Sequence, residues 1–168
     1  RVYYIGTISS NIAKEVTFVP VVEDSDTYLH QILDNGYQRP GKKTRMNQFK
    51  KYLKEYSNRL IPPVILSARG KWKFETKGDG SIGEIQIEGK AAIVDGQHRV
   101  GGIVSHFQDT DEPINFDFIC FDNLSLQEEI NEFKTINGKQ VGVPKALQEY
   151  LGEDPNADLA WELNEHDD

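Results

Sequence analysis

The sequence predicts an α/β (α+β) fold in which a small mixed β-sheet is flanked by helices. Short runs of β-branched and aromatic residues, which are typical of strands, recur along the chain as far as residue 121. Between them lie stretches whose apolar residues are spaced by three or four positions, as in amphipathic helices. Residues 91–107 hold a strand, a glycine turn and a helix in immediate succession. Strands and helices in this interleaved order build one sheet with helices packed on it.

The first sixty residues predict two strands and one helix. Residues 2–8 and 16–22 are β-branched and aromatic, and Asn35-Gly36 indicates a turn after them. A helix is expected over residues 44–60, because its apolar residues form one stripe: Met46, Phe49, Leu53, Tyr56 and Leu60. Three lysines share the side of the helix away from that stripe: Lys50, Lys51 and Lys54.

The middle of the chain predicts a strand, a hairpin and the strand–turn–helix unit. Pro62-Pro63 ends the preceding helix, and residues 64–66 form a short apolar strand. Residues 67–90 are expected to be a β-hairpin with its tip at residues 78–80. The compact apolar run 91–94 is typical of a buried strand. The helix after it is indicated by four apolar residues at helical spacing: Val100, Ile103, Val104 and Phe107.

The last part of the chain predicts one more strand and two helices. Residues 114–121 form the strand, and Ser125 with Glu128 makes a capping box that opens a helix. Asn137-Gly138 indicates a turn, after which Pro144 suits the first turn of a final helix. Residues 1–152 suffice for the domain. The acidic residues 153–168 are expected to be a solvated tail or the start of a further region.

Composition narrows the class of protein. With 168 residues, of which 38% are hydrophobic, the chain can bury a sizeable core as one domain. It has no apolar run of about 18 residues, so no membrane partner is expected. Cys120 is the only cysteine and cannot build a disulfide within the chain, which favours a cytoplasmic location. Because the sequence begins at Arg1 without an initiator Met, we expect it to be a piece of a longer protein.

The charges are sorted along the chain. The formal net charge is -8, which by itself argues against a nucleic-acid partner. Residues 39–77, however, hold twelve Lys and Arg against Glu55 and Glu75, a net charge of +10, whereas residues 78–168 carry a net charge of -15. Binding to a polyanion depends on the local density of Lys and Arg rather than on the total. A nucleic acid therefore stays among the candidate partners.

The turn at residues 95–99 has the residue types of an anion site. Gly96 lets a ligand approach the backbone, the first turn of the helix presents free amides, and Arg99 can grip two oxygens. His98 can donate a hydrogen bond to phosphate, while Asp95 is better suited to fixing the turn or to holding a metal or a sugar hydroxyl. The alternative is an ordinary Asp-Gly turn with a structural histidine and an ion-paired arginine.

Two glycines follow this turn inside the predicted helix. Gly101 and Gly102 each cost about 1 kcal/mol of helix stability relative to alanine. Close packing or the close approach of a ligand would account for them.

At this point the sequence resembles a known family. Residues 94–102, Val-Asp-Gly-Gln-His-Arg-Val-Gly-Gly, are similar to the signature of DGQHR-domain proteins, the group that contains the DNA sulfur modification protein DndB. The resemblance covers about residues 35–150. It implies a ParB/sulfiredoxin-like fold, in which the corresponding turn binds phosphate through positions that match Gly96 and Arg99. It also implies that Asn137 and Gln140 line the same site, so that the expected nucleotide- or phosphate-binding residues are Asp95, Gly96, Gln97, His98, Arg99, Asn137 and Gln140.

Gln97 differs from the residue that sulfiredoxins and ParB proteins carry at this position. Sulfiredoxins carry a cysteine at this position, so their redox chemistry is not expected here. ParB proteins carry a glutamate that helps to bind magnesium, so magnesium stays an open question, with Asp95 as a substitute ligand. Related defence proteins with a DGQQR turn hydrolyse nucleoside triphosphates, which keeps a nucleoside triphosphate among the candidate cofactors.

The basic stretch predicts contact with DNA phosphates. The expected DNA-binding residues are Arg39, Lys42, Lys43, Arg45, Lys50, Lys51 and Lys54. The alternative is that these charges pair with the acidic remainder of the chain. Trp72, Tyr52 and Tyr56 have the chemistry to stack on bases, although core packing also accounts for each of them.

Three functions follow from these features. The leading hypothesis is a DNA-associated domain that binds a nucleotide or phosphate and acts in regulation or sensing within a DNA-modification (phosphorothioation) or phage-defence system. The first alternative is a DNA-stimulated nucleoside triphosphatase. The second is a protein-interaction module without a ligand. DNA is the expected partner, a nucleotide is a candidate partner, and an oligomer is compatible with the sequence.

Overall fold

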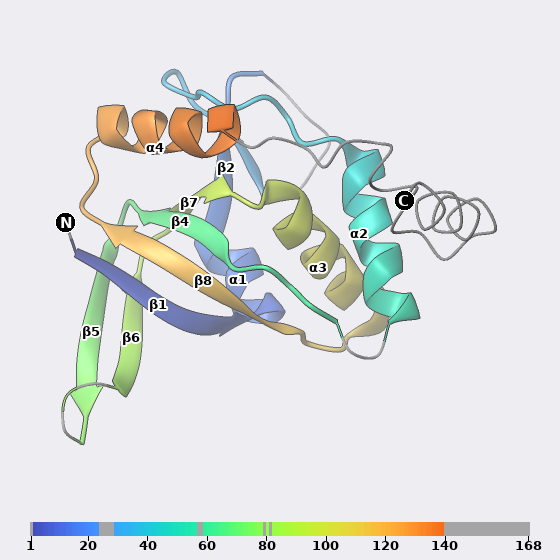
Figure 1. Cartoon of the computed structure of the whole chain (residues 1–168), viewed down its shortest axis with the longest axis horizontal. Coiled ribbons are helices and arrows are strands. Elements are labelled where there is room, and N and C mark those ends of the chain that lie inside the picture. The colour runs from blue at the N-terminus through green and yellow to red at the C-terminus, as the bar shows by residue number, and fades with distance from the viewer. Residues whose placement is uncertain (1, 24–28, 57–58, 79, 81, 140–168) are drawn as a thin grey trace, which may run out of the picture. The chain divides into compact units, whose positions relative to one another are not determined.

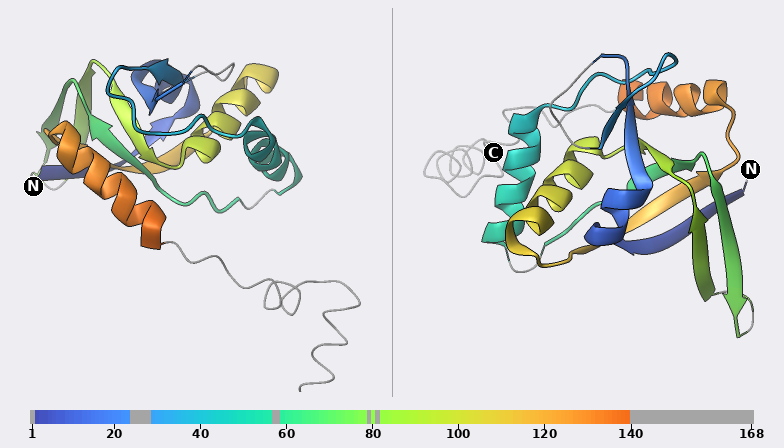
Figure 2. Two further views of the ribbon diagram at one scale, coloured as in Figure 1. Left: turned by 90° about the horizontal axis from the view of Figure 1, so that it is seen from above. Right: turned by 180° about the vertical axis from the view of Figure 1, so that it is seen from behind.

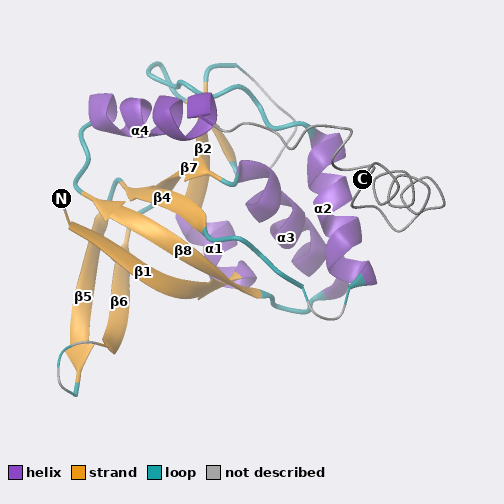
Figure 3. Cartoon of the chain, in the orientation of Figure 1, coloured by secondary structure: helices purple, strands orange, loops and turns teal. Residues whose placement is uncertain are grey.

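The computed structural model describes residues 2–23, 29–56, 59–78, 80 and 82–139 (Figure 1). These residues form eight strands and four helices, which confirms the predicted α+β class (Figure 3). In chain order the elements are β1 (Val2–Ser9), α1 (Ser10–Val16), β2 (Thr17–Val21), β3 (His30–Ile32), α2 (Lys43–Glu55), β4 (Val64–Ala68), β5 (Lys71–Lys77), β6 (Ile82–Glu88), β7 (Ala91–Asp95), α3 (Gln97–Thr110), β8 (Asn115–Asp122) and α4 (Leu126–Lys139).

Six strands form one mixed sheet in the order β1-β8-β4-β7-β2-β3. β1 is antiparallel to β8, and β4 is parallel to β8 but antiparallel to β7. β2 is parallel to both β7 and β3. β5 and β6 pair separately as the predicted antiparallel hairpin. The neighbours in the sheet are thus far apart in the sequence, and β7 lies in its interior.

Helices cover both faces of the sheet (Figure 2). α1 and α3 lie on one face, α4 crosses the opposite face, and α2 packs against α3. This arrangement explains why the run 91–94 is apolar at every position, since successive side chains of a strand point to opposite faces. All four residues of this run are at most 1% exposed. The prediction of a buried strand here is confirmed.

The main core lies between the sheet, α1, α3 and the β5–β6 hairpin. Along β8, the buried Phe116, Phe118 and Cys120 alternate with more accessible residues, as the period of a strand requires. Trp72 of the hairpin is 3% exposed and packs edge-on against Phe118, with ring centroids 6.0 Å apart. The core-packing alternative for Trp72 is therefore the one that the fold realises. Cys120 is a core residue, as expected.

The basic helix α2 ends earlier than the sequence predicted. It stops at Glu55, and Leu60, the last member of the predicted stripe, is 78% exposed. The hydroxyl of Tyr52 accepts a hydrogen bond from the Leu60 amide (2.9 Å) and donates one to the Leu60 carbonyl (3.2 Å). Residue 60 is therefore tied to the side of the helix instead of extending it.

The predicted turn at Asn137-Gly138 is wrong, because α4 continues through both residues. The side-chain amide of Asn137 donates to the carbonyl of Phe133 one turn earlier (2.8 Å), so the asparagine is accommodated within the helix. The start of α4 is as predicted. Glu128 accepts the Ser125 amide (2.9 Å), and the Ser125 hydroxyl accepts the Glu128 amide (3.3 Å), which is the capping box.

Two elements had no counterpart in the sequence-based prediction. α1 has seven residues and β3 has three, which is too short for a periodic signal. Within the described ranges, no helix is long and apolar enough to cross a membrane. Gln140, the predicted last helix near Pro144, the domain end near residue 152 and the acidic residues 153–168 lie outside the described residues.

Candidate functional site

The turn between β7 and α3 is built around Gly96. This residue has φ 95° and ψ 16°, the left-handed conformation, and it caps the 14-residue helix α3. A Cβ atom at this position would lie 2.8 Å from Cγ1 of Val64 and 3.0 Å from Nη2 of Arg99. Both the backbone conformation and the space therefore require glycine here. The strand, glycine turn and helix predicted from the sequence are present in that order.

The N-terminus of α3 presents free backbone amides. The first amide to bond within the helix is that of Val100, which donates to the Gly96 carbonyl (2.9 Å). In the described part of the chain, the amides of residues 97–99 have no such acceptor. No side chain caps them, and the first turn holds no acidic residue. Such an end carries partial positive charge and suits an anion.

Arg99 is fixed at this turn by Asp95. The Nη2 atom of Arg99 donates to Oδ2 of Asp95 (2.7 Å) and lies 3.3 Å from the carbonyl oxygen of Pro63, which also accepts from it. Both side chains of the ion pair are largely buried, with 25% of Arg99 and 19% of Asp95 exposed. Asp95 is thus the ion-pair partner of Arg99, as in the alternative of an ordinary turn with an ion-paired arginine, and its expected role toward a metal or a sugar hydroxyl stays a prediction. Nε of Arg99 is buried and has no hydrogen-bond partner among the described residues.

Two histidines hold the loop at residues 39–42: His98 attaches it to this turn, and His30 attaches it to β3 at the edge of the sheet. The Lys42 amide donates to Nε2 of His98 (3.0 Å), and the Gly41 amide donates to Nε2 of His30 (3.3 Å). An imidazole nitrogen accepts a hydrogen bond only when it carries no proton. Burial lowers the pKa of His98; Arg45, Arg99 and the neighbouring His30 lower it further, and the charge of Asp95 opposes them. Burial also lowers the pKa of His30.

Gln38 holds the same loop at the end of the sheet. Its side chain is 1% exposed, and its amide nitrogen donates to the carbonyl of Ile93 in β7 (2.6 Å). Its backbone amide donates to the Pro20 carbonyl (3.1 Å), and its own carbonyl accepts from the Val22 amide (3.1 Å). The sequence-based prediction missed this residue, because a lone glutamine carries no signal of burial. Gln38 explains why the loop lies beside the turn.

The predicted DNA-binding residues fall into two groups. Four of them lie on the loop or at the start of α2, are exposed, and have no ion pair within the described ranges: Arg39, Lys42, Lys43 and Arg45. The other three are ion-paired. Lys50 and Lys54 contact Asp109 of α3 (3.0 and 3.6 Å), and Lys51 contacts Glu55 (3.5 Å). The hydrogen bond from Lys50 and the two lysine charges lower the pKa of Asp109. Pairing with the acidic remainder of the chain, the alternative weighed above, thus describes Lys50 and Lys54, whereas Lys51 pairs within its own helix.

The two glycines of α3 serve the packing of α2. A Cβ atom on Gly101 would lie 2.7 Å from Sδ of Met46, and one on Gly102 would lie 2.8 Å from the Met46 carbonyl oxygen. Both glycines are buried. Of the two explanations offered by the sequence, close packing is the one that these contacts support. The start of the basic helix is thereby held near the turn.

Neither tyrosine considered for base stacking is buried in the core. Tyr52 is half-buried and makes the hydrogen bonds to Leu60, and Tyr56 is 57% exposed, with the two rings 5.1 Å apart. Asn137, which was expected to line the Arg99 site, uses its amide within α4, and its part in that site stays a prediction. Among the described residues, no group of three His, Cys, Asp or Glu is placed to hold a metal ion.

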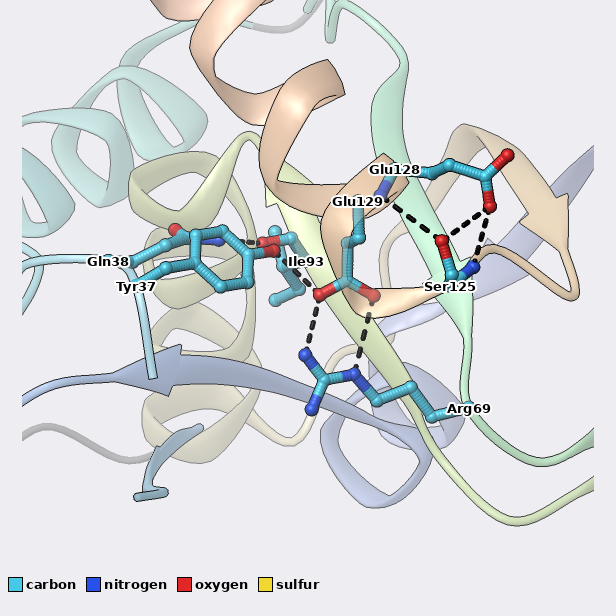
Figure 4. Close-up of polar contacts among 7 residues, drawn as sticks. All are labelled: Tyr37, Gln38, Arg69, Ile93, Ser125, Glu128 and Glu129. Atoms are coloured by element: carbon cyan, nitrogen blue, oxygen red, sulfur yellow. Dashed lines mark hydrogen bonds and ion pairs between the residues drawn. The ribbon is translucent and has the colours of Figure 1, made fainter. Parts of the chain in front are cut away.

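A second polar cluster, absent from the predictions, joins α4 to the rest of the fold (Figure 4). Glu129 is 1% exposed and accepts two hydrogen bonds from Arg69, from Nη2 to Oε1 (2.6 Å) and from Nε to Oε2 (3.3 Å). The Tyr37 hydroxyl donates to the same Oε1 atom (2.8 Å). Burial, followed by the negative charge of Glu129, raises the pKa of Tyr37. Each group is satisfied by another, so the cluster has a structural role.

Fold and turn together define the class of this protein: an α+β domain whose glycine turn, free helix N-terminus and fixed arginine lie beside an exposed basic loop. A family profile described as "DndB: DNA-sulfur modification-associated" matches residues 1–166, so the chain belongs to this family. The expected association with DNA modification is thereby confirmed. Neither the curated proteins nor the solved structures provide a match. The ParB/sulfiredoxin-like and DGQHR assignments therefore stay predictions.

Proposed function

We propose that this domain binds phosphate groups at the β7–α3 turn, and that it reads or regulates DNA sulfur modification by holding DNA there. The observation that carries the proposal is the position of the basic loop. The hydrogen bond from Lys42 to His98 holds this loop against the N-terminus of α3, and the bond from Gly41 to His30 holds it at β3. Free amides and cations that have no ion pair among the described residues are then presented together, and both favour a polyanion.

The distribution of charge also supports DNA binding at the β7–α3 turn and the basic loop. Arg45 and Arg99 both act on His98, so their charges lie near the turn. The cations Arg39, Lys42 and Lys43 are exposed to solvent. The family of the chain is associated with DNA sulfur modification, which makes DNA the polyanion to consider first. A phosphodiester backbone would gain contacts with several of these cations at once and would release its counterions. A single nucleotide also carries phosphate, but it is too short to contact as many of these cations at once.

The geometry favours binding over hydrolysis. The substitute metal ligand considered for a triphosphatase is Asp95, and its carboxylate already accepts a hydrogen bond from Arg99 (2.7 Å). Neutral Gln97 adds no charge for a metal ion. These contacts therefore favour a role in binding and sensing DNA over the hydrolysis of a nucleoside triphosphate.

The test is a fluorescence-anisotropy titration of labelled duplex DNA at several salt concentrations. Lys42→Glu and Arg45→Glu remove exposed cations without touching the backbone contact to His98. Each should weaken binding and lower the slope of log affinity against log salt by about 1. The matched control is Lys73→Glu, whose side chain is 76% exposed in the β5–β6 hairpin and which should bind as the parent chain does.

Two results would overturn the proposal. The first is an affinity that does not fall with salt, and the second is an equal loss in Lys73→Glu and Arg45→Glu. Thermal-shift measurements with ATP, CTP, GTP and duplex DNA separate the two sources of phosphate. Stabilisation by a nucleotide alone would leave the phosphate site in place but refute its use for DNA.

A further inference from the structure

An apolar groove lies between β1, α1 and the β5–β6 hairpin, and none of the residues of the β7–α3 turn lines it. It has a volume of about 1000 Å³, and its lining includes Tyr4, Ile5, Ile12, Phe74, Ile82 and Ile85. Among the described residues of the lining, Glu84 is the one charged side chain, and it is paired with Lys77 of the neighbouring strand. Nothing in the proposed binding of phosphate uses this surface.

One wall of the groove is the edge of the main sheet. β1 is the first strand in the sheet order, and it pairs with β8 in unbroken register from Val2↔Asp122 to Ser9↔Asn115. No described strand pairs with its other edge. Edge strands are normally protected by charges, prolines, bulges or short length. The eight residues of β1 contain no charge and no proline, whereas β3, at the opposite edge, has only three residues.

The apolar side chains around this edge are exposed to an extent that fits an interface. Val2, Tyr3 and Ile5 of β1 are 58%, 56% and 71% exposed, Ile12 of α1 is 47% exposed, and Ile82 of the hairpin is 76% exposed. Covering them in two copies would remove on the order of 1,000 Å² from water before the strand backbone is counted, close to the lower limit of a specific interface. The exposed apolar area at this edge is therefore large enough for a stable dimer interface.

We propose that β1 pairs antiparallel with β1 of a second copy of this chain, so that the main sheet continues across a twofold axis. The groove requires an extended, apolar and uncharged strand, and β1 itself has those properties. Each copy carries a net charge of -8, and an interface at the uncharged strand β1 places no like charges of this strand against one another. A twofold axis also gives the antiparallel arrangement, in which each strand edge satisfies the other.

The first test is the oligomeric state of the purified chain, measured by light scattering and sedimentation velocity over a range of micromolar concentrations. The parent chain should be a dimer, and Ile5→Lys should be a monomer with an unchanged circular-dichroism spectrum, because Ile5 is mostly exposed. The matched control is Ile32→Lys at the opposite edge of the sheet, where Ile32 is 55% exposed. That variant should stay dimeric.

A second test is cross-linking by single cysteines placed in turn along β1. In an antiparallel pair with twofold symmetry, one residue faces its own copy, so one position should form an intermolecular disulfide much faster than its neighbours. Cys120 is fully buried, and position 4, which lies directly opposite it in β8, is left out of the series so that no disulfide forms within one chain. A parent chain that is monomeric, an Ile5→Lys variant that stays dimeric, or cross-linking that does not depend on position would each overturn the proposal.

Discussion

The backbone amide of Lys42 donates a hydrogen bond to the imidazole Nε2 of His98 at 3.0 Å, although the two residues lie 56 positions apart. This bond joins the basic loop to the first turn of α3. It exists only while Nε2 is unprotonated, and the cations around His98 oppose protonation. The charge state of His98 therefore controls one of the contacts that hold the loop, beside those of Gln38 and His30.

The first prediction concerns pH. The pKa of His98 is lowered from 6.5 in the folded state, so the folded chain binds this proton less readily than the unfolded chain. Its contribution to the free energy of unfolding should be complete above the unfolded pKa, and should be lost as the pH falls below 6.5 through the lower folded value. His98→Gln keeps an acceptor for the Lys42 amide but does not titrate. Urea unfolding of parent and variant at several pH values should give the variant a shallower decline.

Burial also lowers the pKa values of His30 and His106, so a residual decline should persist in His98→Gln. An identical pH dependence in the two proteins would show that the hydrogen bond does not couple to His98 protonation.

The second prediction concerns Gly96. An alanine here would occupy a left-handed conformation, at a cost of about 1–2 kcal/mol, and its Cβ atom would also crowd Val64 and Arg99. Gly96→Ala should lower the free energy of unfolding by at least that amount and weaken DNA binding. Gly138→Ala is the control, because a Cβ atom there meets nothing within 4 Å and should be neutral or stabilise the helix by about 0.5–1 kcal/mol. Equal effects in chemical denaturation would contradict the assigned role of Gly96.

The third prediction concerns the buried carboxylate of Glu129. Glu129→Gln leaves Arg69 with a neutral partner in a mostly buried position, which should cost about 2–3 kcal/mol of stability. Glu84→Gln removes an exposed ion pair and should change the stability by less than about 0.5 kcal/mol. Thermal and urea unfolding measure both. A loss in Glu129→Gln no greater than in Glu84→Gln would show that α4 is held by other contacts.

The fourth prediction concerns Cys120. Burial raises the pKa of its thiol to about 12, so at neutral pH it is neither ionised nor accessible. Ellman's reagent should label the native chain only at the rate of unfolding and should label it fully in denaturant. Rapid labelling of one thiol per chain under native conditions would contradict the position of Cys120 in the core.

Local patterns predicted most of the fold. The run 91–94, the turn at Gly96 and the capping box at Ser125 were all correct, because each depends on neighbouring residues. The sequence patterns failed at the ends of two helices, where hydrogen bonds between side chain and backbone decide. The Tyr52 hydroxyl binds the backbone of Leu60 beside α2, and α2 ends before residue 60. The side-chain amide of Asn137 binds the Phe133 carbonyl, and α4 continues through the predicted turn.

The candidate site was predicted in part for the same reason. Gly96 and Arg99 belong to one short motif and could be recognised together. Gln38 and His30 contribute to the surroundings of the turn only through long-range contacts, one to Ile93 and one to the Gly41 amide. The acidic partner of Lys50 and Lys54, Asp109, lies on another helix, so no charge pattern within α2 could reveal it.

The pairing of β1 with β8 also has a consequence for biosynthesis. Val2 pairs with Asp122, so β1 is completed only after β8, more than a hundred residues later in the chain, has been synthesised. At translation rates of about 5–20 residues per second, this leaves β1 without its partner for on the order of ten seconds. Through that interval an uncharged, strand-forming segment is exposed on the nascent chain. A molecule truncated before residue 115 would keep that segment exposed permanently, so premature termination is expected to yield aggregates.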